Sequence, residues 1–138
     1  MTMLATTDQI SYFGYRIPYL EHLGVEPVMC ENDMAITRMA IRPHLVNSRG
    51  HIHGGALMSV LDFTLSAAGR AHDLTGISMA TIDMSTSFMS PGSTDLTITA
   101  TCTHRGGSIC FCEGEVRDTD NKLVAKATAS FKMLKVNR

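Results

Sequence analysis

One acidic residue, Asp62, lies in the middle of an otherwise apolar stretch, between Leu61 and Phe63. It is the only charged residue between Ile52 and Gly69. Burial of a carboxylate without partners costs free energy, so its presence there needs a reason. Capping of a loop or pairing with an arginine is one reason. We favour a second one, which is chemistry, because a carboxylate held away from water suits a general base or a nucleophile.

Two glycines, Gly54 and Gly55, stand at the start of the same stretch. Glycine lets a ligand approach the backbone closely. The first N–H groups of a helix have no internal partner and carry partial positive charge. Such groups can hold a carbonyl oxygen on which negative charge develops during a reaction. A tight packing turn is the alternative interpretation of this pair.

The spacing of Gly54 and Asp62 favours a site built from two chains. Eight residues of helix are about 12 Å long. A single reacting carbonyl group cannot easily lie close to both Gly54 and Asp62 of the same chain. Two antiparallel copies of the helix around a two-fold axis would bring Asp62 of one chain toward Gly54 of the partner subunit. We therefore expect a homodimer with a shared site.

The elements that position these residues are predicted from the periodicity of apolar side chains. A helical spacing predicts a helix over residues 54–72, and because this helix is apolar nearly all round, other structure should wrap it. Residues 25–31 and 34–41 are predicted to form a β-hairpin before it. Four strands are predicted after it, of which the last three form an antiparallel meander: 78–90, 95–104, 109–117 and 123–136. The fold class is α+β, with one helix against one antiparallel sheet.

The length of 138 residues fits one domain. We divide the chain into an N-terminal segment, residues 1–24, with a short helix ended by Gly24, and a single domain over 25–138. With 12 basic and 13 acidic residues the net charge is −1, which argues against nucleic acid and anionic membranes as partners. No apolar run is long enough to span a membrane, and no secretory signal is recognised.

Four cysteines, Cys30, Cys102, Cys110 and Cys112, contain no C-x-x-C pair. This usage is typical of a reduced, cytoplasmic protein and lacks the ligand spacing of a zinc site. We expect the last two to be packing residues, with nothing in the sequence that lowers their pKa. The histidines at positions 44, 51 and 53 have no carboxylate partner in sequence. We therefore expect no metal site.

The spaced residues Asn47-x-x-Gly50-x-x-His53-Gly54-Gly55, followed by Asp62, resemble the signature of the hotdog-fold thioesterases. The branch they resemble most is the acyl-CoA thioesterases of the phenylacetic acid degradation type. The resemblance covers residues 25–135. It implies a hotdog fold, in which a curved antiparallel sheet wraps around one long central helix. It also implies hydrolysis of an acyl- or aryl-CoA thioester to a carboxylic acid and CoA, with no cofactor, by a homodimer that pairs into a tetramer.

The resemblance also implies a role for each matching residue. Asp62 would activate a water molecule or attack the thioester directly, and the hydroxyl of Thr81 would orient that water. The N–H of Gly54, helped by Asn47, would polarise the thioester carbonyl. His53 would support the loop and touch the thioester. Asp62 and Thr81 would face Asn47 and Gly54 across the dimer interface.

Further residues are predicted to contact the CoA part of the substrate: Gly55, Ser90, Pro91, Arg105, Gly106 and Gly107. An arginine beside turn N–H groups suits the phosphates of CoA, although an ordinary hairpin turn explains the same residues. The Ser-Pro pair would be a turn at the rim of the CoA channel.

Two other functions stay open at this point. A hotdog-fold hydratase or dehydratase would use the same CoA channel, with His53 as the partner of the catalytic acid. A non-catalytic acyl-CoA-binding protein would use the same scaffold as a sensor. The sequence leaves the acyl group undetermined among phenylacetyl, hydroxyphenylacetyl, benzoyl and medium-chain fatty acyl groups.

Overall fold

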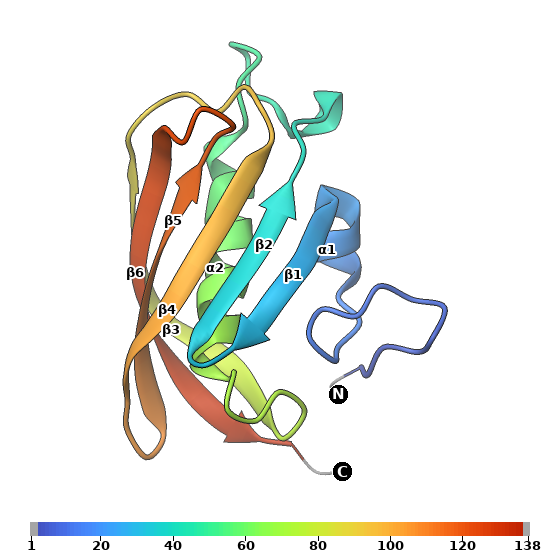
Figure 1. The fold of residues 1–138 in the computed structure, drawn as a ribbon, viewed down its shortest axis with the longest axis vertical. Helices are drawn as coiled ribbons and strands as arrows, with labels where there is room; N and C mark the ends of the chain where they lie inside the picture. The colour runs from blue at the N-terminus through green and yellow to red at the C-terminus, as the bar shows by residue number, and fades with distance from the viewer. Residues whose placement is uncertain (1–2, 137–138) are drawn as a thin grey trace.

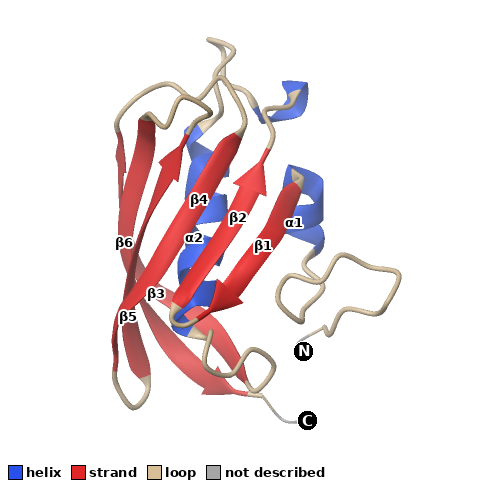
Figure 2. Ribbon diagram, in the orientation of Figure 1, coloured by secondary structure: helices blue, strands red, loops and turns tan. Residues whose placement is uncertain are grey.

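The computed structural model describes residues 3–136 and shows a long helix partly enclosed by one six-stranded antiparallel sheet (Figures 1 and 2). This arrangement confirms the predicted α+β class. The elements in chain order are α1 (Pro18–Leu23), β1 (Val25–Glu31), β2 (Met34–Met39), the short 3₁₀ helix η1 (Pro43–Leu45), α2 (Gly54–Gly69), β3 (Ile77–Phe88), β4 (Leu96–Arg105), β5 (Ile109–Arg117) and β6 (Leu123–Lys135). No helix within residues 3–136 has the length and apolar character needed to cross a bilayer.

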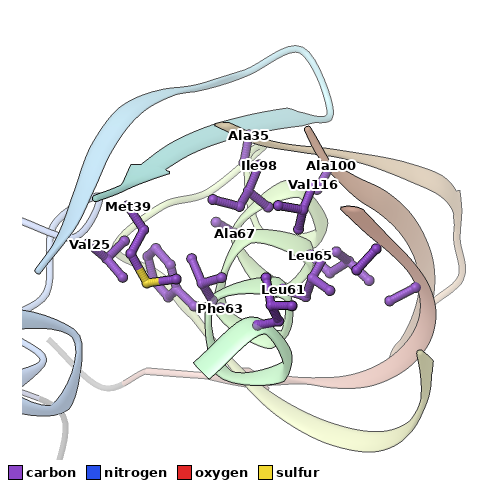
Figure 3. Packing of buried hydrophobic residues seen from close by; sticks show 14 of the residues in the cluster. Val25, Ala35, Met39, Leu61, Phe63, Leu65, Ala67, Ile98, Ala100 and Val116 are labelled. Carbon is purple, nitrogen blue, oxygen red and sulfur yellow. The ribbon is translucent and has the colours of Figure 1, made fainter. Parts of the chain in front are cut away.

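The strands lie in the order β1-β2-β4-β5-β6-β3, so β1 and β3 form the two edges of the sheet. Strands β4, β5 and β6 form the predicted meander. Strand β3 pairs with β6, the last strand, and not with β4, which follows it in sequence. The sheet curves around α2, as the close view of the core shows (Figure 3).

Helix α2 begins where it was predicted to begin, because its first turn is capped. The Nδ1 atom of His53 accepts a hydrogen bond from the N–H of Gly55 at 2.9 Å. The helix ends at Gly69, so the prediction that it continues to residue 72 is wrong. The buried guanidinium of Arg70 turns back instead and donates to the main-chain carbonyls of Tyr12 and Phe13. A positive charge at this end also complements the helix dipole.

The core lies between α2 and the inner face of the sheet (Figure 3). A buried hydroxyl pair, Thr37 and Thr64 at 2.8 Å, joins β2 to the helix. The helix was expected to be wrapped nearly all round, but one face of it stays partly accessible. The residues on this face, called the open stripe below, recur at helical spacing: Gly55, Met58, Ser59, Asp62 and Ser66.

The N-terminal segment packs against the same core. Tyr12 is fully buried and its hydroxyl donates to the carbonyl of Val25 at 3.0 Å. The ring of Phe13 stacks on Phe63, the neighbour of Asp62, with 5.9 Å between the ring centroids. Helix α1 has the predicted position, and Gly24 ends it in the left-handed conformation at φ 74°. The division of the chain at residue 24 stays a prediction.

Candidate active site

Asp62 lies midway along α2 on the open stripe, and it has a partner. Its Oδ1 atom accepts a hydrogen bond from the hydroxyl of Thr81 on β3 at 2.6 Å. Asp62 was expected to lie away from water, but in the single chain it is only half-buried, and Thr81 is exposed. The structure does bring together the two residues that the resemblance paired.

A β-bulge directly follows Thr81 on β3. The pairing of β3 with β6 shifts register between Thr81 and Asp83, and Ile82 has no partner in the ladder. A bulge reorients the side chains beside it because the period of two is interrupted. Ile82 itself is 54% exposed on this edge strand. The acid–hydroxyl pair thus lies beside an uncovered apolar side chain at the edge of the sheet.

The loop before α2 fixes the side chain of Asn47. The Oδ1 atom of Asn47 accepts hydrogen bonds from the N–H of Arg49 at 2.9 Å and of His51 at 3.2 Å. Gly50 has a φ of 78°, which glycine adopts without strain and which this turn requires. Because the loop uses the amide oxygen, the NH₂ group of Asn47 is left as the donor. Within residues 3–136 this NH₂ group makes no hydrogen bond.

Of the two glycines, Gly54 offers the available donor. The N–H of Gly55 is bonded to the His53 imidazole, so that group is not free for a ligand in this arrangement. No hydrogen bond from the N–H of Gly54 is found in the described part of the chain. His53 therefore supports the helix start, while its contact with a thioester stays a prediction.

A cavity of about 420 Å³ lies at this end of α2. Its lining includes four residues predicted for the site: Asn47, Gly54, Ser90 and Pro91. The side chain of Ser90 is fixed by a 2.6 Å hydrogen bond to the carbonyl of Leu123. The cavity can hold a small acyl or thioester group against two amide donors, the N–H of Gly54 and the NH₂ group of Asn47.

Two residues that sequence reasoning did not assign to substrate binding, Arg49 and Phe88, also line this cavity. The Phe88 ring lies over the helix start, 3.4 Å from the position that a Cβ atom would have at Gly54. His51, considered only as a metal ligand, lines it too, and its buried Nδ1 has no hydrogen-bond partner within residues 3–136. An arginine inside the Asn-x-x-Gly motif was the signal that could have pointed to this loop as a binding element.

The chain holds the candidate site as two separated halves. The acid–hydroxyl pair is not part of the cavity lining, and Asp62 lies eight residues, about 12 Å, further along the helix than Gly54. Within one chain, a carbonyl group held by Gly54 and Asn47 is therefore out of reach of the Asp62 carboxylate. That a second copy of the chain completes the site stays a prediction.

Arg105, predicted to bind phosphate, has other partners at the opposite end of α2. Its guanidinium donates to the carboxylate of Asp33 at 2.8 Å and to the carbonyl of Gly69 at 3.0 Å. Through these contacts Arg105 caps the C-terminus of α2. Gly106 and Gly107 form the adjoining hairpin turn, where the N–H of Gly106 donates to Ile109. Phosphate binding by this turn stays a prediction.

Three of the four cysteines lie together, which their sequence spacing did not indicate. The Sγ atoms of Cys102, Cys110 and Cys112 are all within 4.8 Å of one another. A hydrogen bond from the Cys112 thiol lowers the pKa of Cys110 and raises the pKa of Cys112. The expectation that nothing lowers a thiol pKa on this strand is therefore wrong. The fourth residue, Cys30, lies elsewhere and donates to the carbonyl of Ala67 at 3.2 Å.

With this geometry in view, comparison with known proteins identifies the family. The family model described as "Thioesterase superfamily" matches residues 49–125, more than half of the chain. The chain belongs to the thioesterase superfamily. The matched range includes Gly54, Asp62 and Thr81, and it begins two residues after Asn47.

Individual relatives agree with this assignment. A conserved protein from Pseudomonas aeruginosa is 31% identical, with a TM-score of 0.81 over 86% of this chain and 94% of that one. The E. coli PaaI protein, from the phenylacetic acid degradation operon, has a TM-score of 0.79 at 22% identity over 86% of this chain and 85% of that one, a likeness that shows the fold. A Schizosaccharomyces pombe protein named as an esterase is 28% identical over 64% of this chain. The chain spans 56% of the length of that relative.

Proposed function

We propose that the protein is an acyl-CoA thioesterase with two identical active sites, each formed between two copies of the chain. The observation that carries this proposal is the division of the site into two halves. One half is the Asp62–Thr81 pair on the open stripe, and the other is the pair of amide donors, Gly54 N–H and Asn47 NH₂, at the cavity. The family assignment and the esterase relative support hydrolysis of a thioester.

The proposed reaction converts a thioester and water into a carboxylic acid and a thiol. The carbonyl oxygen lies between Gly54 N–H and Asn47 NH₂, which stabilise the negative charge that develops there. The carboxylate of Asp62 either removes a proton from a water molecule held near the Thr81 hydroxyl or attacks the carbonyl carbon itself. In the first route, the proton that Asp62 takes from water passes to the sulfur as the C–S bond breaks. In the second route, C–S cleavage releases CoA as a thiolate that takes a proton from solvent, and water then hydrolyses the acyl–Asp62 anhydride to the carboxylic acid and the free carboxylate. Oxygen-18 labelling in a single turnover distinguishes the two routes.

The surface around Asp62 supports a second copy of the chain as its neighbour. Strand β3 is an edge of the sheet, and an open edge is usually paired or covered. Ile82 on this edge and Met58 on the open stripe are 54% and 39% exposed. In the proposed dimer, two β3 edges join, and the two α2 helices run antiparallel around the two-fold axis. A cytoplasmic location and a tetramer of two dimers complete the proposal.

A mixing experiment tests the shared site directly. Asp62→Asn and Asn47→Ala each disable a different half, so each variant alone should lose at least about tenfold in turnover. When the two are co-expressed, random pairing makes half of the dimers mixed, and each mixed dimer has one intact site. The mixture should therefore recover about a quarter of wild-type activity. If each site belonged to one chain, the mixed dimers would stay inactive.

The assay also separates the rival functions. Release of free thiol is measured over a panel of aromatic and aliphatic acyl-CoAs, and loss of the double bond is measured with an enoyl-CoA. Asp120→Asn, in an exposed turn, is the matched control for loss of one carboxylate. Hydration without thiol release would identify a hydratase. Binding without either reaction would identify an acyl-CoA-binding protein.

A further inference from the structure

Three sulfur atoms meet where the β4–β5 hairpin packs against the end of α2. Cys102 on β4 is the direct partner of Cys112 on β5, and Cys110 lies two residues before Cys112 on the same face of the strand. Cys110 and Cys112 are buried, whereas Cys102 is half-buried. All three Sγ atoms lie within 4.8 Å of one another. The cluster thus has two enclosed thiols and one that reaches toward the surface.

The last residue of the helix leaves room for this cluster. A Cβ atom on Gly69 would lie 2.7 Å from Sγ of Cys110 and 3.3 Å from Sγ of Cys112. It would also lie 2.8 Å from the terminal methyl group of Met79. Any other residue at this position would therefore collide with the sulfur cluster. The same space places the thioether end of Met79 beside the thiols.

The donor set consists of sulfur only. Within residues 3–136, no carboxylate or imidazole atom joins the three thiols in the cluster. The nearby carboxylate of Asp33 is held by Arg105 at 2.8 Å, so it is already paired. The guanidinium of Arg105 lies on the same side, and its positive charge offsets the negative charge of thiolates. The site therefore offers soft ligands beside a fixed cation.

We propose that Cys102, Cys110 and Cys112 form a binding site for a soft monovalent metal ion, Cu(I). Thiolates and thioethers select such ions. Three sulfurs bonded at about 2.3 Å around one metal in a plane are about 4 Å apart, so the cluster needs to contract by less than about 1 Å. A structural zinc ion takes four ligands, and the cluster holds three thiols with no nitrogen or oxygen ligand. The site lies at the opposite end of α2 from Gly54 and does not depend on the proposed thioesterase activity.

Titration with Cu(I) under anaerobic conditions tests the site. The reduced, metal-free protein competes with a coloured Cu(I) chelator, after mass spectrometry has verified four free thiols. We expect one Cu(I) per chain. Cys102→Ser and Cys112→Ser should each weaken binding by about tenfold or more. Cys30→Ser is the matched control and should bind like the wild type, because Cys30 lies outside the cluster.

Two variants keep the result interpretable if the buried variant Cys112→Ser unfolds. Cys102 is half-buried, so Cys102→Ser removes a ligand from the accessible side of the cluster. Gly69→Ala keeps every thiol but fills the space beside them, and it should also weaken binding. The proposal is overturned if wild type and Cys102→Ser bind Cu(I) equally, or if Cys30→Ser loses as much affinity as Cys112→Ser. Tighter binding of Zn(II) than of Cu(I) would also overturn it.

Discussion

The hydrogen bond between Thr81 and Asp62 gives the sharpest test of the proposed chemistry. Thr81→Val removes the hydroxyl and keeps the shape of the side chain. The 2.6 Å bond joins a hydroxyl to a carboxylate, and such a bond contributes about 1.5–3 kcal/mol. If the transition state loses that contribution, kcat/KM should fall by roughly 10- to 150-fold. Because Thr81 is exposed, the stability of the fold should change little.

Thr81→Ser is the matched control, since it restores the hydroxyl and removes only a methyl group. It should retain activity within about threefold of the wild type. Initial rates of thiol release from the best acyl-CoA of the panel measure both variants, and sedimentation verifies that the oligomeric state is unchanged. Wild-type activity in Thr81→Val would refute the role of the hydroxyl. Equal losses in both variants would show that packing, and not the hydrogen bond, matters at this position.

Two predictions concern stability. Burial, with a smaller effect from the charge of Glu21, raises the pKa of Tyr12 from 10.0 to about 12. The neutral hydroxyl therefore contributes its full stability to the fold below pH 10, and this contribution is lost as the pH rises to 12. The urea midpoint of the wild type should therefore fall more steeply over that interval than that of Tyr12→Phe, and equal slopes would contradict this. A Cβ atom on Gly114 would lie 2.8 Å from the carbonyl oxygen of Thr99, so Gly114→Ala should lower the free energy of unfolding by about 1–3 kcal/mol. Gly107→Ala, with nothing within 4 Å of its Cβ position, should be nearly neutral in the same urea titration.

The sequence predicted the elements well where local signals decide them. The start of α2 was predicted from Gly54 and Gly55 together with the helical spacing that follows them, and alternation located the strands of the meander. The end of α2 could not be predicted, because Arg70 is held by the carbonyls of Tyr12 and Phe13, which are 58 and 57 residues away. The exposure of Asp62 depends on how far the sheet curves around the helix. That curvature is a property of the whole sheet and leaves no local pattern in the sequence.

The candidate site residues were predicted from their types and spacing, whereas the contact between two of them was not. Asn47, Gly54 and Asp62 stand out by type and spacing, which predicts the chemistry. The contact of Thr81 with Asp62 came only from the family resemblance, because the two residues are 19 positions apart and no periodicity links them. Arg49 and Phe88 were missed, since a single arginine in a loop or a single aromatic residue at a strand end is common.

Both clusters of reactive side chains in this chain lie beside a β-bulge. One bulge falls between Thr81 and Asp83, and the other between Cys102 and His104. From Thr97 to Cys102 the ladder with β5 is regular, and Cys102 lies opposite Cys112 on the same face as the buried Ile98 and Ala100. The bulge follows Cys102 and shifts the register by one residue, so that Arg105, and not His104, lies opposite Cys110. A single extra residue in each strand therefore decides which side chains meet, and alternation read from the sequence cannot reveal where that residue lies.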